Sequence, residues 1–310
     1  MCFGQLRARS LFPIAIGIAT CWGLGAARPC AAASIGFSRT TSAGVPVMVI
    51  TVDLNDPAVK VTGMLAQYGS GHSERFDSMI SRTHPTAAVT GTFFGEGSLL
   101  PIGDIVVDGK MVHQGGVGTG LCITPDNDCQ FVHPPHRYTN MDWSPFDFVC
   151  CSGPCLVRHG RVGVYPAAEG FHDHDLLGMA TRLAVGRTRH NKLLFVTTRC
   201  RIYLSRMARV MRKLGCLDAI SLDAGSSLGY YYKGRMLVAP HRKLTNLILI
   251  YNDRSRYTRF KSRLFPTRQE TAQQESRGEM ASRHLPFTQT DRFPDAYPAV
   301  RKENGTWWVR

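Results

Sequence analysis

Residues 219–227 (AISLDAGSS) constrain the fold more than any other part of the chain. The apolar half of this stretch is typical of a buried strand, and the strand stops at Asp223. Gly225, Ser226 and Ser227 follow at once and predict a tight turn whose backbone N–H groups and hydroxyls point outward. A carboxylate beside such a turn indicates an anion-binding site, because successive turn N–H groups can hold phosphate or carboxylate oxygens. A polar turn capped by Asp223 uses the same residue types, so the spacing leaves both interpretations open.

Other segments have the composition and alternation of β-strands. Asp108 and Gly109 join two short strands, because this dipeptide favours a hairpin turn. Residues 204–215 are predicted to form a helix with one apolar face that ends at Gly215. We therefore expect an α+β fold: a mixed, mainly antiparallel twisted β-sheet with a few helices packed on it, in a loop-rich single domain. The longer predicted strands are 45–54, 59–66, 87–94, 193–198, 219–222, 230–232 and 244–251.

Residues 1–33 have the layout of a secretory signal peptide. Arg7 and Arg9 precede an apolar run over residues 11–26, and small residues follow at 31–34. The run is too short and too interrupted by glycine for a typical membrane-spanning helix, although an uncleaved anchor is the alternative. We therefore expect an exported protein, periplasmic or secreted, with no stable membrane span after cleavage.

The rest of the chain is predicted to divide after Tyr251. Residues 34–251 contain the predicted strands and form the domain. Residues 252–310 are rich in Arg, Gln, Glu, Ser and Pro, a composition that predicts a mobile, basic tail. Trp307 and Trp308 near its end could dock back onto the domain, or the tail could be an extension with no part in the chemistry.

The formal net charge of +14 could indicate a nucleic-acid-binding protein. However, several arginines lie in or near the signal segment, and many others alternate with polar residues in the tail rather than line one face. We therefore predict no nucleic-acid partner. The basic surface favours an anionic glycan, a phospholipid headgroup or a cell-wall polymer, or is solvated without a partner.

Ten cysteines are reasonable for an exported protein, in which disulfides persist. Three of them belong to the signal segment. The other seven are Cys122 with Cys129, Cys200 with Cys216, and the cluster Cys150, Cys151 and Cys155. Cys122 and Cys129 flank a turn and are expected to face each other across a hairpin. A zinc site in the cluster is the alternative, although it lacks two separated Cys-x-x-Cys pairs.

Taken in chain order, several segments resemble the phosphodiester glycosidase family, over roughly residues 46–251. The matching segments are 87–94 (AAVTGTFF), 101–115 (PIGDIVVDGKMVHQG), 179–186 (MATRLAVG), 222–227 (LDAGSS) and 229–251. The chain has GTFF where the family usually has an Asn-Gly-Gly-Phe-Phe type of stretch. It also has LDAGSS where the family usually has LDGGGS, which puts Ala224 in a glycine position.

The resemblance implies a hydrolase that cleaves the glycosyl–phosphate linkage of a sugar phosphodiester, in exopolysaccharide or cell-envelope glycan metabolism. The substrate would be an anionic glycan or a sugar phosphate. A catalytically inactive binding module for anionic glycans is the alternative, because Ala224 departs from the family pattern. A serine hydrolase that uses Ser226 is disfavoured, because no Gly-x-Ser-x-Gly elbow surrounds this residue.

Cleavage of this kind requires a clamp for the leaving phosphate, a carboxylate and a pocket for the sugar ring. Asp223 is the first candidate for the catalytic carboxylate, and Asp104 is the second, either as its acid–base partner or as a strand-end cap. The resemblance points to Arg182 as a phosphate ligand, since a guanidinium fits two phosphate oxygens. The other predicted substrate-binding residues are Thr92, Gly225, Ser226, Ser227, His172, His241 and Arg242.

The run EGFHDHD (residues 169–175) packs two histidines and three acids into seven residues. His172 and His174 would share one face of an extended strand, so a divalent metal is an alternative here. A solvated loop, or a loop that contacts the sugar, would have the same composition. We therefore predict no defined metal ligands and no established cofactor.

Overall fold

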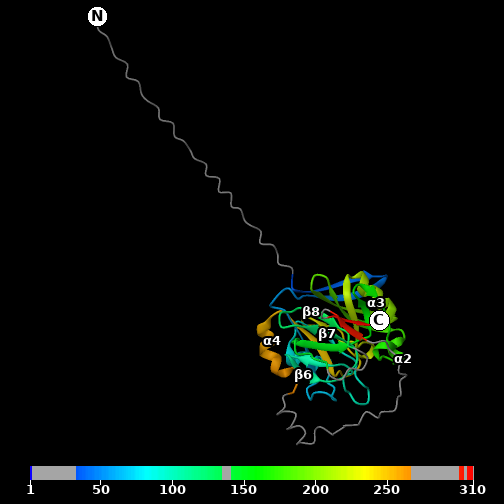
Figure 1. Ribbon diagram of the computed structural model, residues 1–310. Coiled ribbons are helices and arrows are strands. Elements are labelled where there is room, and N and C mark those ends of the chain that lie inside the picture. Colours follow the sequence, from blue (N-terminus) through cyan, green and yellow to red (C-terminus); the bar gives the residue numbers. More distant parts are fainter. Residues whose placement is uncertain (2–32, 135–140, 267–299, 304–305, 310) are drawn as a thin grey trace. The chain divides into compact units, whose positions relative to one another are not determined.

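The computed structural model describes Met1 and residues 33–134, 141–266, 300–303 and 306–309. A seven-stranded antiparallel sheet, here called the first sheet, contains the longest strands (Figure 1). Its strands, in spatial order, are β1 (Ile35–Ser42), β2 (Val45–Asp53), β13 (Lys192–Ile202), β12 (Ala180–Thr188), β14 (Cys216–Leu222), β10 (Cys155–Arg158) and β11 (Arg161–Val162). The central strands are apolar on both faces, because both faces are covered.

Two five-stranded sheets complete the domain. The second sheet has the order β16 (Arg235–Val238), β15 (Tyr230–Tyr232), β4 (Ala87–Thr90), β17 (Asn246–Tyr251) and β3 (Lys60–Leu65). The third has the order β6 (Lys110–His113), β5 (Ile105–Val107), β9 (Phe148–Ser152), β7 (Thr119–Ile123) and β8 (Cys129–Val132). Every strand pairing among the described residues is antiparallel. The predicted α+β class is therefore confirmed, with the strands divided among three sheets.

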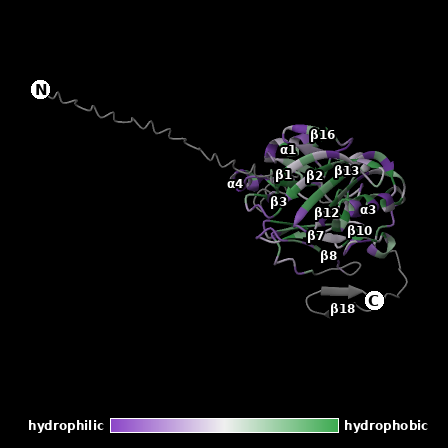
Figure 2. Ribbon diagram, turned by 90° about the horizontal axis from the view of Figure 1, so that it is seen from above, coloured by the Kyte–Doolittle hydropathy of each residue, from purple (hydrophilic) through white to green (hydrophobic). Residues whose placement is uncertain are grey.

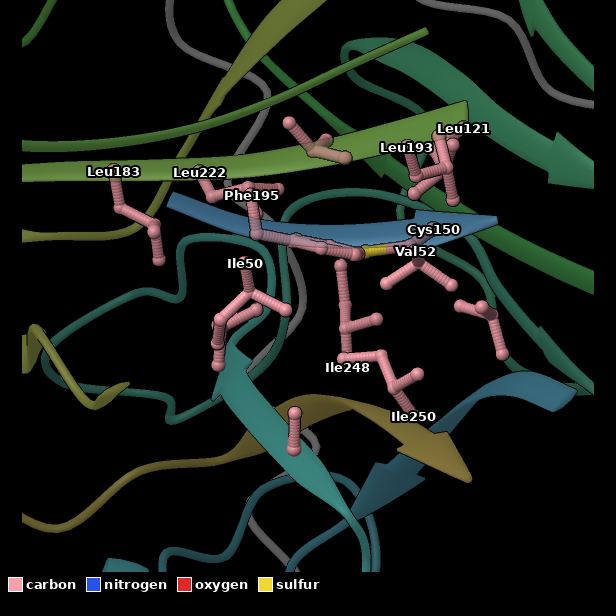
Figure 3. Packing of buried hydrophobic residues seen from close by; sticks show 14 of the residues in the cluster. Ile50, Val52, Leu121, Cys150, Leu183, Leu193, Phe195, Leu222, Ile248 and Ile250 are labelled. Atoms are coloured by element: carbon pink, nitrogen blue, oxygen red, sulfur yellow. The ribbon is translucent and has the colours of Figure 1, made fainter. Parts of the chain in front are cut away.

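The main hydrophobic core lies where the first sheet faces the other two (Figure 3). Ile50 and Phe195 contribute from the first sheet, Ile248 from the second, and Leu121 and Cys150 from the third. All five side chains are almost completely buried. Burial of apolar surface on this scale is the main force that holds the sheets together. The strands at the centre of the domain are accordingly hydrophobic in Figure 2.

Helix α3 (Leu204–Lys213) covers the outer face of the first sheet. Met207, Val210 and Met211 are fully buried there against Leu194 and Val196 of β13. The apolar face predicted for this helix is therefore confirmed. Because successive residues of a strand point to opposite faces, β13 supplies the inner core with Phe195 and the outer core with its neighbours.

Helices α1 (Phe76–Thr83) and α4 (Arg254–Phe260) cover the outer face of the second sheet. Asp253 caps α4 by accepting a hydrogen bond from the backbone N–H of Ser255 at 2.8 Å. Tyr257 and Leu264 are buried in the same cluster as α1. The folded domain therefore extends past Tyr251, the predicted boundary, to at least residue 265, because two apolar side chains anchor a mostly polar segment. Residues 267–299 of the predicted tail lie outside the described residues.

The remaining elements are short. They are α2 (His174–Leu177), the 3-10 turns η1 (Ala167–Glu169), η2 (Gly225–Ser227) and η3 (Lys261–Arg263), and the hairpin of β18 (Val300–Glu303) and β19 (Thr306–Val309). Trp307 and Trp308 belong to β19. The predicted signal peptide lies outside the described residues apart from its two ends. Among the described residues, no helix is both long and apolar enough to cross a membrane.

The predicted pairing of Cys122 with Cys129 is wrong. In the β7–β8 hairpin, Cys129 lies opposite Ile123, and Cys122 lies opposite Gln130. The two cysteines therefore point to opposite faces of the third sheet. Cys129 enters the main core, whereas Cys122 packs on the outer side with Trp143. The same alternation separates Cys150 from Cys151, and no disulfide joins the seven cysteines of the described residues.

Tyr230 links the second sheet to the first through its buried hydroxyl. This hydroxyl accepts a hydrogen bond from the N–H of Ile50 at 2.8 Å and donates to the carbonyl of Phe195 at 2.7 Å. We predict that Tyr230→Phe lowers the free energy of unfolding by about 1–3 kcal/mol, because it leaves a buried N–H without an acceptor. Urea unfolding should show a lower midpoint with an unchanged m-value.

Tyr232→Phe is the matched control, because it removes a hydroxyl of the same strand. The Tyr232 hydroxyl donates to the carbonyl of Ile35 at 3.1 Å from a partly exposed position, so its loss should have a smaller effect. Equal destabilisation by the two substitutions would contradict the special role assigned to Tyr230.

Candidate functional site

Strand ends from the first and second sheets meet around Asp223. The backbone N–H of Asp223, just after β14, donates to the carbonyl of Gly91, just after β4, at 3.0 Å. The side-chain oxygen of Asn246, the first residue of β17, accepts a hydrogen bond from the N–H of Thr92 at 2.8 Å. Three strands from two sheets therefore bring their ends to one place, as expected for a site built on rigid elements.

Asn246 fixes the segment that follows β4. Its amide nitrogen donates to the carbonyl of Thr92 at 3.0 Å, so both polar atoms of the Asn246 amide are used on Thr92. A Cβ atom at position 91 would lie 2.1 Å from the Asn246 side-chain oxygen, so only glycine fits there. The role of Asn246 could not be predicted from the sequence, because a polar residue at the start of an apolar strand does not reveal which loop it contacts. The glycine of GTFF was its only sign.

Asp223 is a buried carboxyl with one unused oxygen. The residue is 3% exposed, and its Oδ2 makes no hydrogen bond with the described residues. Burial raises the pKa of the Asp223 carboxyl from 3.8 to about 7, and a hydrogen bond with Ser227 and the charge of Arg242 oppose this rise. A carboxyl with this pKa is present in both protonation states near neutral pH. A perturbed acid of this kind is typical of a catalytic position.

Arg242 supplies the positive charge that faces Asp223. Its Nη2 atom lies 3.8 Å from Asp223 Oδ2, and its Nε donates to the hydroxyl of Ser227 at 2.6 Å. The guanidinium stacks over the ring of Phe94, 4.5 Å from the ring centre, and its Nη1 donates to Glu96 at 2.9 Å. Because the Arg242 side chain is 32% exposed, this cation can be reached from solvent.

The turn η2 has the conformation that its sequence predicts. Gly225 has a φ of +59°, which favours glycine, whereas Ala224 has a φ of −147°, which any residue can adopt. The alanine in a family glycine position therefore does not have the positive φ that would require glycine. Ser227 N–H donates to the Ala224 carbonyl, so the N–H groups of Gly225 and Ser226 precede the first bond of the turn. Groups at this position have no partner within the turn and are suited to binding an anion.

Arg182 is engaged by backbone carbonyls. Its guanidinium donates to the carbonyls of Ile202 at 3.0 Å and Leu176 at 2.9 Å, and also to that of Gly178. The β12–β14 register places Leu183 opposite Leu222, so Arg182 begins next to Asp223 along the sheet. Its side chain nevertheless serves the segment around α2, and burial lowers its pKa to about 10. The structure brings Arg242, rather than Arg182, to Asp223.

Asp104 is buried and already has three N–H donors. Its carboxylate accepts hydrogen bonds from the backbone of Gly115 at 2.8 Å and Gly116 at 3.2 Å, and from the indole of Trp143 at 2.7 Å. These bonds fix loops that flank the third sheet, and none of the partners is shared with Asp223. They favour the strand-end structural role for Asp104, and its acid–base role stays a prediction.

The other predicted ligands occupy different positions. Thr92 is fully buried, and its hydroxyl has no hydrogen-bond partner among the described residues. The backbone N–H of His241 donates to the carbonyl of Ser226 at 2.8 Å, which ties the loop of Arg242 to η2. His172 is exposed. Among the described residues, no cluster of three His, Cys, Asp or Glu side chains could hold a metal ion.

Glu169 is a second carboxyl that titrates near neutral pH. Burial raises its pKa from 4.5 to about 7, and hydrogen bonds from the N–H of Cys155 at 3.0 Å and the hydroxyl of Thr119 at 3.4 Å act in the opposite direction. Cys155 opens β10, which pairs with β14 through Ile220. Glu169 therefore holds the start of β10, and β10 lies next to β14, the strand that ends just before Asp223. In the sequence, Glu169 is distinguished only as the first residue of the acidic and histidine-rich run 169–175.

Asp223 makes the stability of the protein depend on pH. Because its pKa is higher in the folded protein than in a free chain, the folded state holds this proton more tightly. The stability that the carboxyl contributes is fully present below about pH 4 and is lost as the pH rises to about 7. The wild type therefore loses stability as the pH rises through this range, whereas Asp223→Asn does not. We predict that the stability of Asp223→Asn relative to the wild type increases from pH 4 to pH 7 by at most about 4 kcal/mol, which corresponds to a shift of about three pKa units.

Urea unfolding at pH 5 and pH 8 measures this difference. Thr92→Val is the control, because it changes a buried neutral group of the same site. Its effect on the free energy of unfolding should be the same at pH 5 and at pH 8. A stability difference between Asp223→Asn and the wild type that does not change between pH 5 and pH 8 would rule out the raised pKa.

Comparisons with known proteins give one family match and two structural likenesses that bear on the fold. The phosphodiester glycosidase family matches residues 83–251. Among solved structures, the catalytic domain of zebrafish N-acetylglucosamine-1-phosphodiester alpha-N-acetylglucosaminidase, auto-inhibited by its pro-peptide, superposes with a TM-score of 0.56 at 21% identity. That match covers 70% of this chain and 82% of the zebrafish chain.

A hypothetical protein from Synechocystis superposes with a TM-score of 0.59 at 13% identity, over 70% of this chain. This chain spans only 61% of the length of the Synechocystis chain. No curated protein matches the sequence. The structural likenesses show the fold, and the family match covers more than half of the 310 residues, including Gly91, Asp223 and Arg242. The chain therefore belongs to the phosphodiester glycosidase family.

Proposed function

We propose that the protein is an exported hydrolase that cleaves the glycosyl–phosphate linkage of a sugar phosphodiester. The observation that carries the proposal is the pair formed by Asp223 and Arg242, in which a buried carboxyl oxygen without a hydrogen bond lies 3.8 Å from a solvent-accessible guanidinium. Membership in the family supports the reaction type. A carboxyl beside a cation is also what this chemistry requires.

Arg242 would stabilise the leaving group. When the bond between the anomeric carbon and its oxygen breaks, the electron pair leaves with the phosphate, and negative charge grows on that oxygen. A guanidinium binds phosphate oxygens through paired N–H groups, so its interaction strengthens as this charge develops. The first N–H groups of η2, at Gly225 and Ser226, follow Asp223 within three residues and would add to the same effect.

Asp223 would act on the sugar side of the bond. As a carboxylate it can stabilise the oxocarbenium-like centre or accept a proton from the attacking water. Its hydrogen bond with Ser227 and the charge of Arg242 both favour this ionised form. The products are a sugar with a free anomeric hydroxyl and a phosphomonoester. Because the phosphomonoester is already a good leaving group, the reaction needs less proton donation than hydrolysis of an ordinary glycoside.

The substrate class follows from the family and the charge. We propose an anionic glycan of an exopolysaccharide or of the cell envelope, which the net charge of +14 and the signal-like N-terminal sequence support. The zebrafish relative acts on an N-acetylglucosamine-1-phosphodiester, as its name states. This diester is therefore the first substrate to assay.

We predict that Asp223→Asn reduces kcat on a cleaved sugar phosphodiester by about 10²–10⁴-fold, the usual loss when a general base is removed. Binding of the substrate should persist, because Arg242 remains in place. Steady-state kinetics and calorimetric titration of the same samples measure the two effects. If the wild type binds anionic glycans but cleaves no member of a diester panel, with or without chelator, the inactive binding module becomes the correct assignment.

We further predict that Arg242→Ala raises KM and lowers kcat for sugar phosphodiesters, with a total loss in kcat/KM of about 10²–10³-fold, as for other groups that stabilise a developing anion. Arg242→Lys should restore only part of the loss, because an ammonium cannot form the paired bonds of a guanidinium. The control is Arg75→Ala, which removes an exposed charge from the start of α1. A comparable loss in this variant would show that only the net charge matters.

A further inference from the structure

The guanidinium of Arg242 divides its nitrogens among three partners. Nε donates to the Ser227 hydroxyl, Nη2 faces Asp223, and Nη1 donates to Glu96. Two of these partners are carboxyls in opposite environments. The Asp223 side chain is 4% exposed, whereas the Glu96 side chain is 87% exposed. Arg242 therefore joins the buried interior of the site to a carboxylate in solvent.

Glu96 is weakly held at this position. It lies on the tight turn after Phe94, in which Leu99 N–H donates to the Gly95 carbonyl at 2.7 Å. Among the described residues, its carboxylate contacts Arg242 alone. An exposed ion pair of this kind contributes little, because water screens it and both side chains lose freedom. The contact can therefore be broken at small cost.

Glu96 occupies the nitrogen that an incoming anion needs. A guanidinium binds phosphate best through two N–H groups at once. Nε is used by Ser227 inside the site, and Nη2 points towards Asp223. Nη1 is bound to Glu96, the exposed partner of the guanidinium. A phosphate that binds Nη1 and Nη2 together therefore meets the Glu96 carboxylate at Nη1, and the two negative groups compete for the same side of the guanidinium.

We infer that Glu96 is a displaceable counterion of Arg242, which anionic ligands replace on binding and which returns when the phosphomonoester leaves. The inference rests on the proposed function for its catalytic consequence. The product carries more negative charge than the diester, so without a competitor it would be held more tightly than the substrate. A carboxylate that competes for Nη1 weakens both, and assists release of the product. Glu96 thus determines how strongly the site holds anions.

The test uses Glu96→Gln in the full chain, with inorganic phosphate as the probe. The glutamine keeps the size of the side chain and removes its charge. Calorimetric titration should show the Kd of phosphate falling about 1.5–5-fold, the range expected for loss of an exposed ion pair. For a cleaved sugar phosphodiester, KM should fall by a similar factor and inhibition by phosphate should become stronger. KM for an uncharged nitrophenyl glycoside of the same sugar should not change.

Asp77→Asn is the matched control. Asp77 is an exposed carboxylate that pairs with Arg75 on α1 at 2.7 Å, so the variant loses the same charge away from the site. Its Kd for phosphate should equal that of the wild type. If Asp77→Asn tightens phosphate as much as Glu96→Gln does, the effect belongs to net charge and the inference is wrong. Weaker phosphate binding in Glu96→Gln would also overturn it, because Glu96 would then orient Arg242 for the anion.

The outcomes separate this inference from the proposed function. If the wild type cleaves no sugar phosphodiester but Glu96→Gln still tightens phosphate, the counterion role stands and the hydrolase assignment fails. If the wild type cleaves the diester and Glu96→Gln leaves phosphate binding unchanged, the hydrolase assignment stands and the counterion role fails.

Discussion

The hydrogen bond from Asp223 to the Gly91 carbonyl joins two sheets at the point where their strands end. The shared apolar core brings the first and second sheets together, and most of its side chains belong to the strands. At the strand ends the chain must turn, and polar residues take over. Because these ends are covered by neighbouring loops, the polar groups are buried by the fold. The burial of Asp223, and hence its raised pKa, follows from this arrangement.

A buried carboxyl of this kind lowers the stability of the folded protein at neutral pH. A hydrophobic residue could fill the same space without the cost of removing a charge from water. The structure offsets only part of that cost, with one hydroxyl from Ser227 and a cation, Arg242, that lies beyond hydrogen-bonding distance. Complete pairing would stabilise the ionised form and return the pKa to its ordinary range. Incomplete pairing is therefore what keeps Asp223 able to exchange protons, a compromise between stability and activity that functional sites commonly show.

The local features of the site could be predicted from the sequence, whereas the partners of its charged side chains could not. The strand that stops at Asp223, the glycine turn after it and the apolar face of α3 each depend on neighbouring residues, which a pattern records directly. Arg182 illustrates why such partners could not be predicted. Its backbone lies next to Asp223 in the sheet, but its guanidinium binds three carbonyls near α2 and β13. A shift of one residue in the β7–β8 register likewise separated Cys122 from Cys129. Two apolar side chains beyond Tyr251, Tyr257 and Leu264, pack into the domain although the segment around them has a polar composition.

Arg242 connects the electrostatics of the site to the order of events that we propose. Before substrate binds, the guanidinium has one carboxylate on its exposed side and one titrating carboxyl on its buried side. A phosphodiester carries a single negative charge, so its exchange with Glu96 leaves the charge around Arg242 the same. Cleavage breaks this balance, because the phosphomonoester carries additional charge and raises the free energy of an ionised Asp223 beside it. In the sequence of events that we propose, the return of Glu96 in place of the product restores the starting charge, so the same exposed carboxylate competes with the substrate and restores the charge around Asp223.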